Sequence, residues 1–125
     1  MTRTDLIVLA VDDDMINLKL LKSMLLKSGH VKEVIEARNG SDAIGELKAR
    51  DDIDLILLDI IMPIMGGIEM LKVVRADENL RQLPIIVLTT DETKKAEALE
   101  CGANGFLMKP IRNNDLMQKM QTVIV

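Results

Sequence analysis

The stretch at residues 53–63, IDLILLDIIMP, decides the fold of this chain. Five of its first six residues are apolar, and a Met-Pro pair closes it. A run this short and this apolar predicts a strand buried on both faces, as in a parallel sheet. Asp59 ends the strand, and a buried carboxylate is costly unless it is paired or bound to a cation. Asp59 is therefore either a cap for the next turn or a reactive group at the carboxyl edge of the sheet, where open α/β sheets place their sites.

Composition excludes several function classes. The 125 residues suit one domain, with 48% hydrophobic and 29% charged residues. One Phe and no Trp or Tyr argue against the stacking platforms that bind single-stranded nucleic acid. A net charge of −4 without a basic cluster argues against a face that binds duplex nucleic acid. One Cys and one His exclude an intrachain disulfide and a Cys/His metal site.

No targeting or membrane segment stands out. The apolar run at residues 6–11 is too short for a signal sequence. No stretch approaches the ~20 apolar residues that span a bilayer. We therefore expect a cytoplasmic protein with no membrane contact.

Strand and helix patterns alternate along the whole chain. Apolar runs predict strands, and periodic segments bounded by Gly, Asn or Ser predict helices. Such alternation with short connections predicts a parallel sheet covered on both faces, a three-layer doubly wound α/β sandwich, with residues 1–125 forming one domain. The predicted strands lie at 6–11, 31–37, 53–59, 85–88 and 106–108, and the helices at 15–28, 41–49 (with Ser41 as its cap), after Gly66-Gly67, at 92–100 and at 113–124.

Polar groups follow four of these strands, so one edge of the sheet should collect them: Asp12 to Asp14, Asp59, Thr89 with Thr90, and Lys109. Converging carboxylates repel one another unless a cation lies between them, and a hard cation such as Mg²⁺ takes oxygen ligands. Carboxylate, Mg²⁺, lysine and hydroxyl together suit phosphoryl transfer, with an Asp oxygen as nucleophile. Each residue alone also fits a structural role as a cap or a solvated charge. Their convergence favours the functional interpretation.

The order and spacing of these motifs resemble the receiver domain of response regulators in two-component signalling, of the chemotaxis type. The resemblance implies a flavodoxin-like fold with five helices and strand order 2-1-3-4-5. It covers nearly the whole chain. The motifs that carry it are Val11-Asp12-Asp13, Asn39-Gly40, Leu58-Asp59 with Met62-Pro63 and Gly67, residues 84–89, and FLMKP at 106–110.

The resemblance implies a phosphorylation site. Asp59 would accept a phosphoryl group from a phosphohistidine on a sensor kinase or phosphotransfer protein. Asp12, Asp13, Asp59 and the backbone carbonyl of Ile61 would hold Mg²⁺, Asp13 directly and Asp12 largely through water. Lys109 would pair with a phosphoryl oxygen.

The resemblance also implies a switch. Thr89 would bond another phosphoryl oxygen and move inward, and Phe106 would rotate into the space that Thr89 leaves. Such a switch is a two-state element biased by a local change of charge. The last three elements of the fold would carry the signal to a downstream protein or to an output domain, and we expect no output domain within these 125 residues.

The chain departs from the common receiver pattern at a few positions. Gly66 stands where many members have Asp, and Thr90 stands where a smaller residue is usual. The resemblance implies that Ile61 and Asp91 would flank the water that attacks an acyl phosphate. An apolar Ile61 cannot orient that water, so we expect slow self-dephosphorylation.

Two other functions fit parts of the pattern. Asp12-Asp13-Asp14-Met15-Ile16 also matches the start of haloacid-dehalogenase-like phosphatases, with Asp12 as nucleophile and Asp14 as general acid. That alternative leaves Leu58-Asp59 and Met62-Pro63 unexplained, and Asp14 is better placed to cap the first helix. A receiver-like adaptor that works without phosphorylation is the third alternative.

Overall fold

The computed structural model describes residues 2–124. Its centre is a five-stranded parallel sheet in the order β2-β1-β3-β4-β5. This is the strand order that the resemblance to receiver domains implies, and it places β2, which is only partly buried, at one edge. The strands are β1 (Leu6–Val11), β2 (Val31–Ala37), β3 (Leu55–Asp59), β4 (Ile85–Thr89) and β5 (Gly105–Met108).

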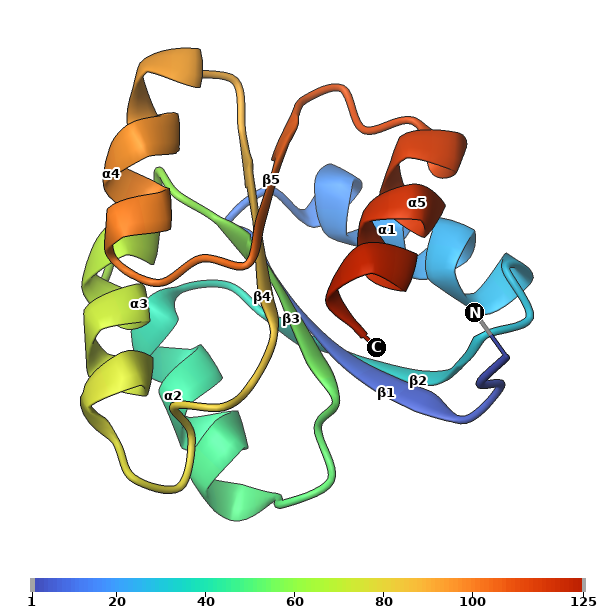
Figure 1. The fold of residues 1–125 in the computed structure, drawn as a ribbon, viewed down its shortest axis with the longest axis horizontal. Helices are drawn as coiled ribbons and strands as arrows, with labels where there is room; N and C mark the ends of the chain where they lie inside the picture. Colours follow the sequence, from blue (N-terminus) through green and yellow to red (C-terminus); the bar gives the residue numbers. More distant parts are fainter. Residues whose placement is uncertain (1, 125) are drawn as a thin grey trace.

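Helices cover both faces of the sheet, as Figure 1 shows: α1 and α5 lie on one face, and α2, α3 and α4 lie on the other. The doubly wound three-layer sandwich is therefore confirmed. The helices are α1 (Met15–Lys27), α2 (Gly40–Ala49), α3 (Gly67–Ala76), α4 (Lys95–Glu100) and α5 (Asn113–Val123), with one 3-10 turn, η1 (Glu92–Lys94), ahead of α4.

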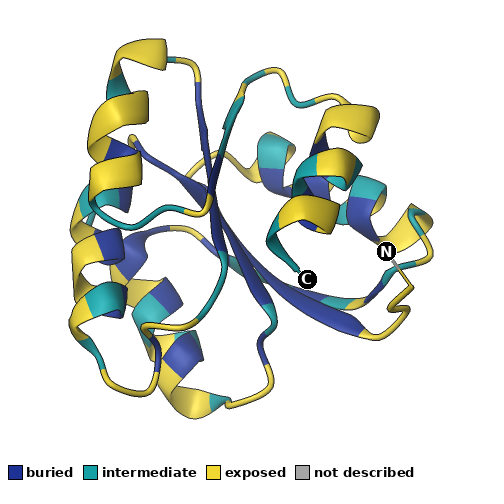
Figure 2. Cartoon of the chain, viewed as in Figure 1, coloured by how far each residue is buried: buried dark blue, intermediate teal, exposed yellow. Residues whose placement is uncertain are grey.

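The core is aliphatic and has two layers, one on each face of the sheet. All the residues of β1 are buried, and they alternate between the two layers: Leu6, Val8 and Ala10 face α1 and α5, whereas Ile7, Leu9 and Val11 face the other three helices. Figure 2 shows the buried strands passing through the middle of the molecule between exposed helix faces. Strands buried on both faces explain the continuous apolar runs in the sequence.

Local capping explains where the first two helices begin. Asp14 caps α1, because its carboxylate accepts a hydrogen bond from the backbone N–H of Ile16 at 2.9 Å. The prediction that Ser41 caps α2 is wrong. Asn39 is the cap: its side-chain oxygen accepts from the N–H of Asp42 at 2.8 Å, so the helix starts at Gly40.

Several further boundaries differ by one or two residues from the predicted ones; for example, the first helix ends at Lys27, β4 ends at Thr89 and β5 begins at Gly105. The central strand begins at Leu55 rather than at residue 53, although Ile53 is buried before it. The fourth helix opens as the 3-10 turn η1, in which the Asp91 side chain accepts from the N–H of Thr93 at 3.0 Å. The last helix ends at Val123, one residue before the predicted end.

Candidate functional site

Three carboxylates meet where β1 and β3 end. Asp12 follows β1 directly, Asp13 is next to it, and Asp59 is the last residue of β3. One oxygen from each side chain lies within 4.8 Å of the others. Asp12 and Asp59 are buried, whereas Asp13 is exposed and leaves the cluster open to solvent. β1 and β3 pair in parallel, so both strands end at the same edge of the sheet.

Lys109 is the cation of this cluster. Its ammonium donates to Asp12 Oδ2 at 2.9 Å and lies 3.4 Å from Asp59 Oδ1. The Lys109 side chain is only 15% exposed. Burial alone would lower its pKa, but the hydrogen bond to Asp12 and the charge of Asp59 outweigh burial and raise that pKa. Lys109 is therefore held as a cation between the carboxylates of Asp12 and Asp59, which lie at the ends of the neighbouring strands β1 and β3.

The Asp59 carboxyl binds protons more tightly than an ordinary aspartate. Burial and the nearby Asp12 carboxylate raise the pKa of Asp59 to about 6, although Lys109 opposes the shift. One ammonium therefore does not compensate three carboxylates. A further cation at this edge would relieve the excess negative charge.

The backbone fits tightly around Asp59. A Cβ at Gly67 would lie 2.5 Å from the Asp59 carbonyl oxygen and 2.7 Å from Ile60 Cα, so any side chain there would push α3 away from β3. The N–H of Gly67 also donates to the carbonyl of Ile60 at 2.8 Å. The glycine in the motif is thus explained by a close approach of two backbones.

Thr89 and Phe106 share one face of the sheet beside the cluster. Thr89 ends β4, next to β3, and is buried. Its hydroxyl oxygen accepts from the backbone N–H of Asp91 at 3.1 Å, which leaves the hydroxyl proton free to donate elsewhere. Phe106 pairs with Val87, two residues before Thr89, so both side chains point to the same side. The Phe106 ring is half-buried.

The loop between β3 and α3 exposes apolar side chains to solvent. Ile61 is 59% exposed and Ile64 is 81% exposed. Ile64 has φ +69°, and the N–H of Met65 donates to the carbonyl of Pro63 at 2.8 Å, which makes a γ-turn centred on Ile64. A β-branched residue in this left-handed region is strained.

The predicted site residues separate into three groups. Asp12, Asp13, Asp59 and Lys109 come together, and Thr89 ends the neighbouring strand. Ile61 and Thr90 follow the ends of β3 and β4, and Phe106 lies within β5. Asp14, which the phosphatase alternative needs as general acid, is an exposed helix cap. The contact between the Lys95 ammonium and the Phe106 ring was not predicted, because the two residues belong to different elements.

The donor set fits Mg²⁺. Three carboxylates present oxygen atoms within one small volume, and Mg²⁺ binds through one or two carboxylates with water completing its shell. The exposed Asp13 gives such an ion a route from solvent.

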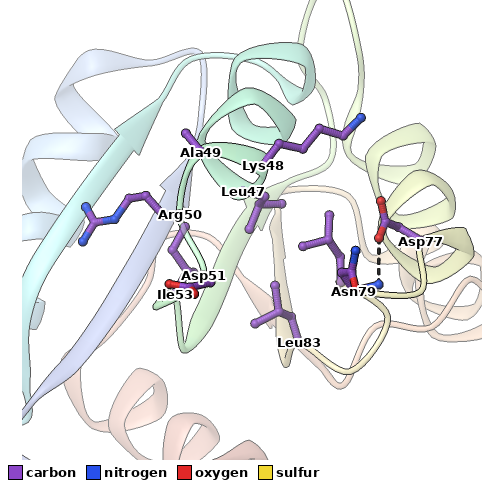
Figure 3. Close-up of a pocket in the computed structure, with 10 residues that line it drawn as sticks. Leu47, Lys48, Ala49, Arg50, Asp51, Ile53, Asp77, Asn79 and Leu83 are labelled. Atoms are coloured by element: carbon purple, nitrogen blue, oxygen red, sulfur yellow. Dashed lines mark hydrogen bonds between the residues drawn. The ribbon is translucent and has the colours of Figure 1, made fainter.

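A hollow of about 820 Å³ lies away from this cluster, between the end of α2, the start of β3 and the loop before β4 (Figure 3). Leu47, Ile53 and Leu80 form its buried apolar floor. Lys48 and Asp77 line it in Figure 3, and Asp77 accepts from the N–H of Asn79 at 2.8 Å. The hollow brings together no group of metal-ligating side chains, so cavity size does not locate the chemistry of this molecule.

Comparison with known proteins assigns the family. A model of the response regulator receiver domain matches residues 8–121. Chemotaxis protein CheY1 of Helicobacter pylori strain J99 is 36% identical over 120 residues, which are 94% of this chain and 95% of that protein. The chain belongs to the response regulator receiver family. It is thus a phosphoacceptor signalling domain of the two-component type rather than a classical enzyme, and the phosphatase alternative is wrong.

Solved structures agree with this assignment. Chemotaxis protein CheY4 of Vibrio cholerae superposes with a TM-score of 0.85 at 34% identity, covering 94% of this chain and 98% of that one. The receiver domain of the sensor histidine kinase PA1611 from Pseudomonas aeruginosa superposes with a TM-score of 0.86 at 29% identity, covering 95% and 97%. That structure has a magnesium ion coordinated in its active site cleft. Among the residues described here, no helix is long and apolar enough to cross a membrane.

Proposed function

We propose that this chain is a phosphorylation-activated switch in which Asp59 accepts a phosphoryl group from a phosphohistidine. The observation that carries the proposal is the convergence of Asp12, Asp13 and Asp59 with Lys109 at the carboxyl edge of the sheet. An Asp59 oxygen attacks phosphorus and forms the O–P bond while the P–N bond to histidine breaks. The electron pair of that bond stays with the imidazole nitrogen. The product is an acyl phosphate.

The charged residues of the site have separate roles in this step. Asp12, Asp13, Asp59 and the carbonyl of Ile61 would hold Mg²⁺, with Asp12 acting largely through water. Mg²⁺ held there would supply positive charge to the phosphoryl oxygens. Lys109 already lies 3.4 Å from Asp59 Oδ1, which is close enough for its ammonium to contact a phosphoryl oxygen on that carboxylate.

Thr89 and Phe106 would convert the modification into a change of shape. The free hydroxyl proton of Thr89 would donate to a phosphoryl oxygen and draw that side chain inward. The Phe106 ring, on the same face of the sheet, would follow into the space released. Because phenylalanine has no hydroxyl, the inward ring needs no hydrogen-bond partner.

Partners follow from this chemistry. The donor would be a sensor histidine kinase or a histidine phosphotransfer protein. The face formed by α4, β5 and α5 would contact a downstream protein or an output domain. We infer a cytoplasmic setting and one receiver domain spanning residues 1–125, with no direct contact to nucleic acid. The exposed, apolar Ile61 cannot orient an attacking water, so the acyl phosphate should be long-lived.

Intact mass spectrometry after incubation with acetyl phosphate and Mg²⁺ tests the proposal. The wild type should gain one phosphoryl group, Asp59→Asn should gain none, and the mass recorded over time gives the lifetime of the adduct. An adduct that persists in Asp59→Asn and disappears in Asp12→Asn would contradict the assignment of Asp59. No adduct in a folded wild type that binds Mg²⁺ would instead indicate an adaptor that works without phosphorylation.

A further inference from the structure

The side chain of Lys95 lies over the ring of Phe106, the one phenylalanine in a chain without Tyr or Trp. Its ammonium is 5.9 Å from the centroid of the Phe106 ring, which is within the range of a cation–π interaction. Lys95 is the first residue of α4, whereas Phe106 belongs to β5. Within the described residues, Lys95 makes no ion pair, so the ring face is the partner that the structure gives this charge.

The ring has two different surroundings. One side packs against the buried cluster under α3 and α4, and the remaining surface is open beside the exposed Lys95. Thr89 lies on the same face of the sheet, two residue pairs further towards the carboxyl edge. In this position, which we call outward, the half-exposed ring makes its cation–π contact with Lys95.

We propose that Lys95 is a positioning residue that holds the Phe106 ring outward and so sets the resting state of the switch. The proposal rests on the function proposed above, because it concerns the regulation of that same site. By this proposal, the contact is lost when the ring moves inward. A single exposed contact of this kind shifts a two-state equilibrium by about two- to fivefold. Lys95 thus shifts the equilibrium towards the outward ring but leaves the inward position accessible.

Nuclear magnetic resonance on a chain labelled with ¹³C-phenylalanine tests this directly, because one Phe gives one set of ring signals. In the wild type the signals should move when acetyl phosphate and Mg²⁺ are added. For each variant, the chemical shift of the ring signals in the phosphorylated form is the reference for the inward ring. Lys95→Met should raise the inward population of the unphosphorylated protein by about two- to fivefold. Lys95→Arg keeps the cation and should behave like the wild type.

Two controls separate this role from a general effect on α4. Lys94→Met removes the neighbouring charge, which the structure does not place over the ring, and should leave the ring signals at their wild-type positions. Replacing Phe106 by 3,5-difluorophenylalanine weakens the negative face of the ring without removing its bulk. Fluorination should raise the inward population in the wild type and have no further effect in Lys95→Met, because the contact is already lost there.

The outcomes distinguish this proposal from the function on which it rests. Equal ring signals in Lys95→Met and Lys94→Met, or equal effects of fluorination with and without Lys95, would overturn the role of Lys95. Wild-type signals that stay in place while the mass shows one adduct on Asp59 would also overturn it, and would leave Asp59 as the phosphoacceptor. A folded wild type that gains no adduct would overturn the proposed function, and the role of Lys95 with it.

Discussion

The position of the Asp59 carboxyl at the buried edge of the sheet lowers the stability of the metal-free fold. Its pKa is raised from 3.8 to about 6 by burial and by Asp12, so the folded chain binds this proton more tightly than the unfolded chain does. The stability contributed by the protonated carboxyl is complete below about pH 4 and is lost as the pH rises through about 6. At neutral pH the ionised Asp59 therefore destabilises the metal-free fold.

Asp59→Asn should stabilise the metal-free protein at pH 7.5 by about 1–3 kcal/mol. The gain should shrink as the pH falls through 6, because the wild-type carboxyl becomes neutral there. Urea unfolding with EDTA at pH 7.5 and pH 5 measures the difference. Asp51→Asn is the matched control, since that residue is exposed and lies in the α2–β3 connection, away from the cluster. Equal gains at both pH values would contradict the explanation.

Ile64 has a backbone conformation that disfavours a β-branched side chain. Its φ of +69° costs an L-residue about 1–2 kcal/mol, and with 81% exposure its side chain regains little by packing. Ile64→Gly should raise the free energy of unfolding by about 1 kcal/mol, because glycine reaches positive φ without a Cβ clash. Ile64→Asn should gain less, because the αL conformation that asparagine tolerates is not that of a γ-turn. Ile64→Val keeps the branched side chain and should show no gain in the same urea titration.

Among the elements, α3 is tied to its neighbours by one arginine. The Arg75 guanidinium donates to the carbonyls of Gly102, Arg81 and Leu83 and to the side-chain oxygen of Asn104, at 2.7–3.0 Å. Burial lowers the pKa of this guanidinium. Its partners are neutral oxygens from the loop that precedes β4 and from the loop that precedes β5, so one side chain fixes how α3 meets both loops.

Arg75→Met should destabilise the protein by about 2–4 kcal/mol, because four acceptors lose a charged donor. Lys72→Met, on the same helix and exposed, should change stability little. Phosphorylation of Asp59 should survive in Arg75→Met, because Arg75 lies near the C-terminal end of α3 and the cluster lies near its N-terminal end. A loss below about 1 kcal/mol in urea unfolding would mean that water replaces the guanidinium.

The elements were largely predictable, whereas the contacts of single side chains were not. Apolar runs are long enough to predict every strand of the sheet, and parallel topology then places Asp12 beside Lys109, 97 residues away. Asn39 and Ser41 are both good caps, and only the observed backbone shows which of them accepts from the helix. The γ-turn at Ile64 and the hydrogen bonds of Arg75 depend on how loops fold over one another, which periodicity does not report.

At the scale of the whole molecule, the two aliphatic layers stabilise the fold, whereas the excess negative charge at the carboxyl edge of the sheet destabilises it. Both layers consist of buried apolar side chains from the strands and the helices that cover them. Three carboxylates and one ammonium lie together at the carboxyl edge of the same sheet. A ligand that binds only the folded state stabilises the whole fold by about 2.7 kcal/mol at 100 times its dissociation constant. A cation at this edge should therefore act on global unfolding and not only on the site.

Mg²⁺ should raise the urea midpoint of the wild type in proportion to the logarithm of its concentration once the site is saturated. Asp13→Asn should lose most of this response, and because Asp13 is exposed the variant should still fold. Asp59→Asn should show opposite effects: it is more stable than the wild type in EDTA and gains less from Mg²⁺. Potassium chloride at matched ionic strength controls for general screening. If Mg²⁺ raised the midpoints of the wild type and Asp13→Asn equally, the effect would be screening, and the three carboxylates would not form a magnesium site.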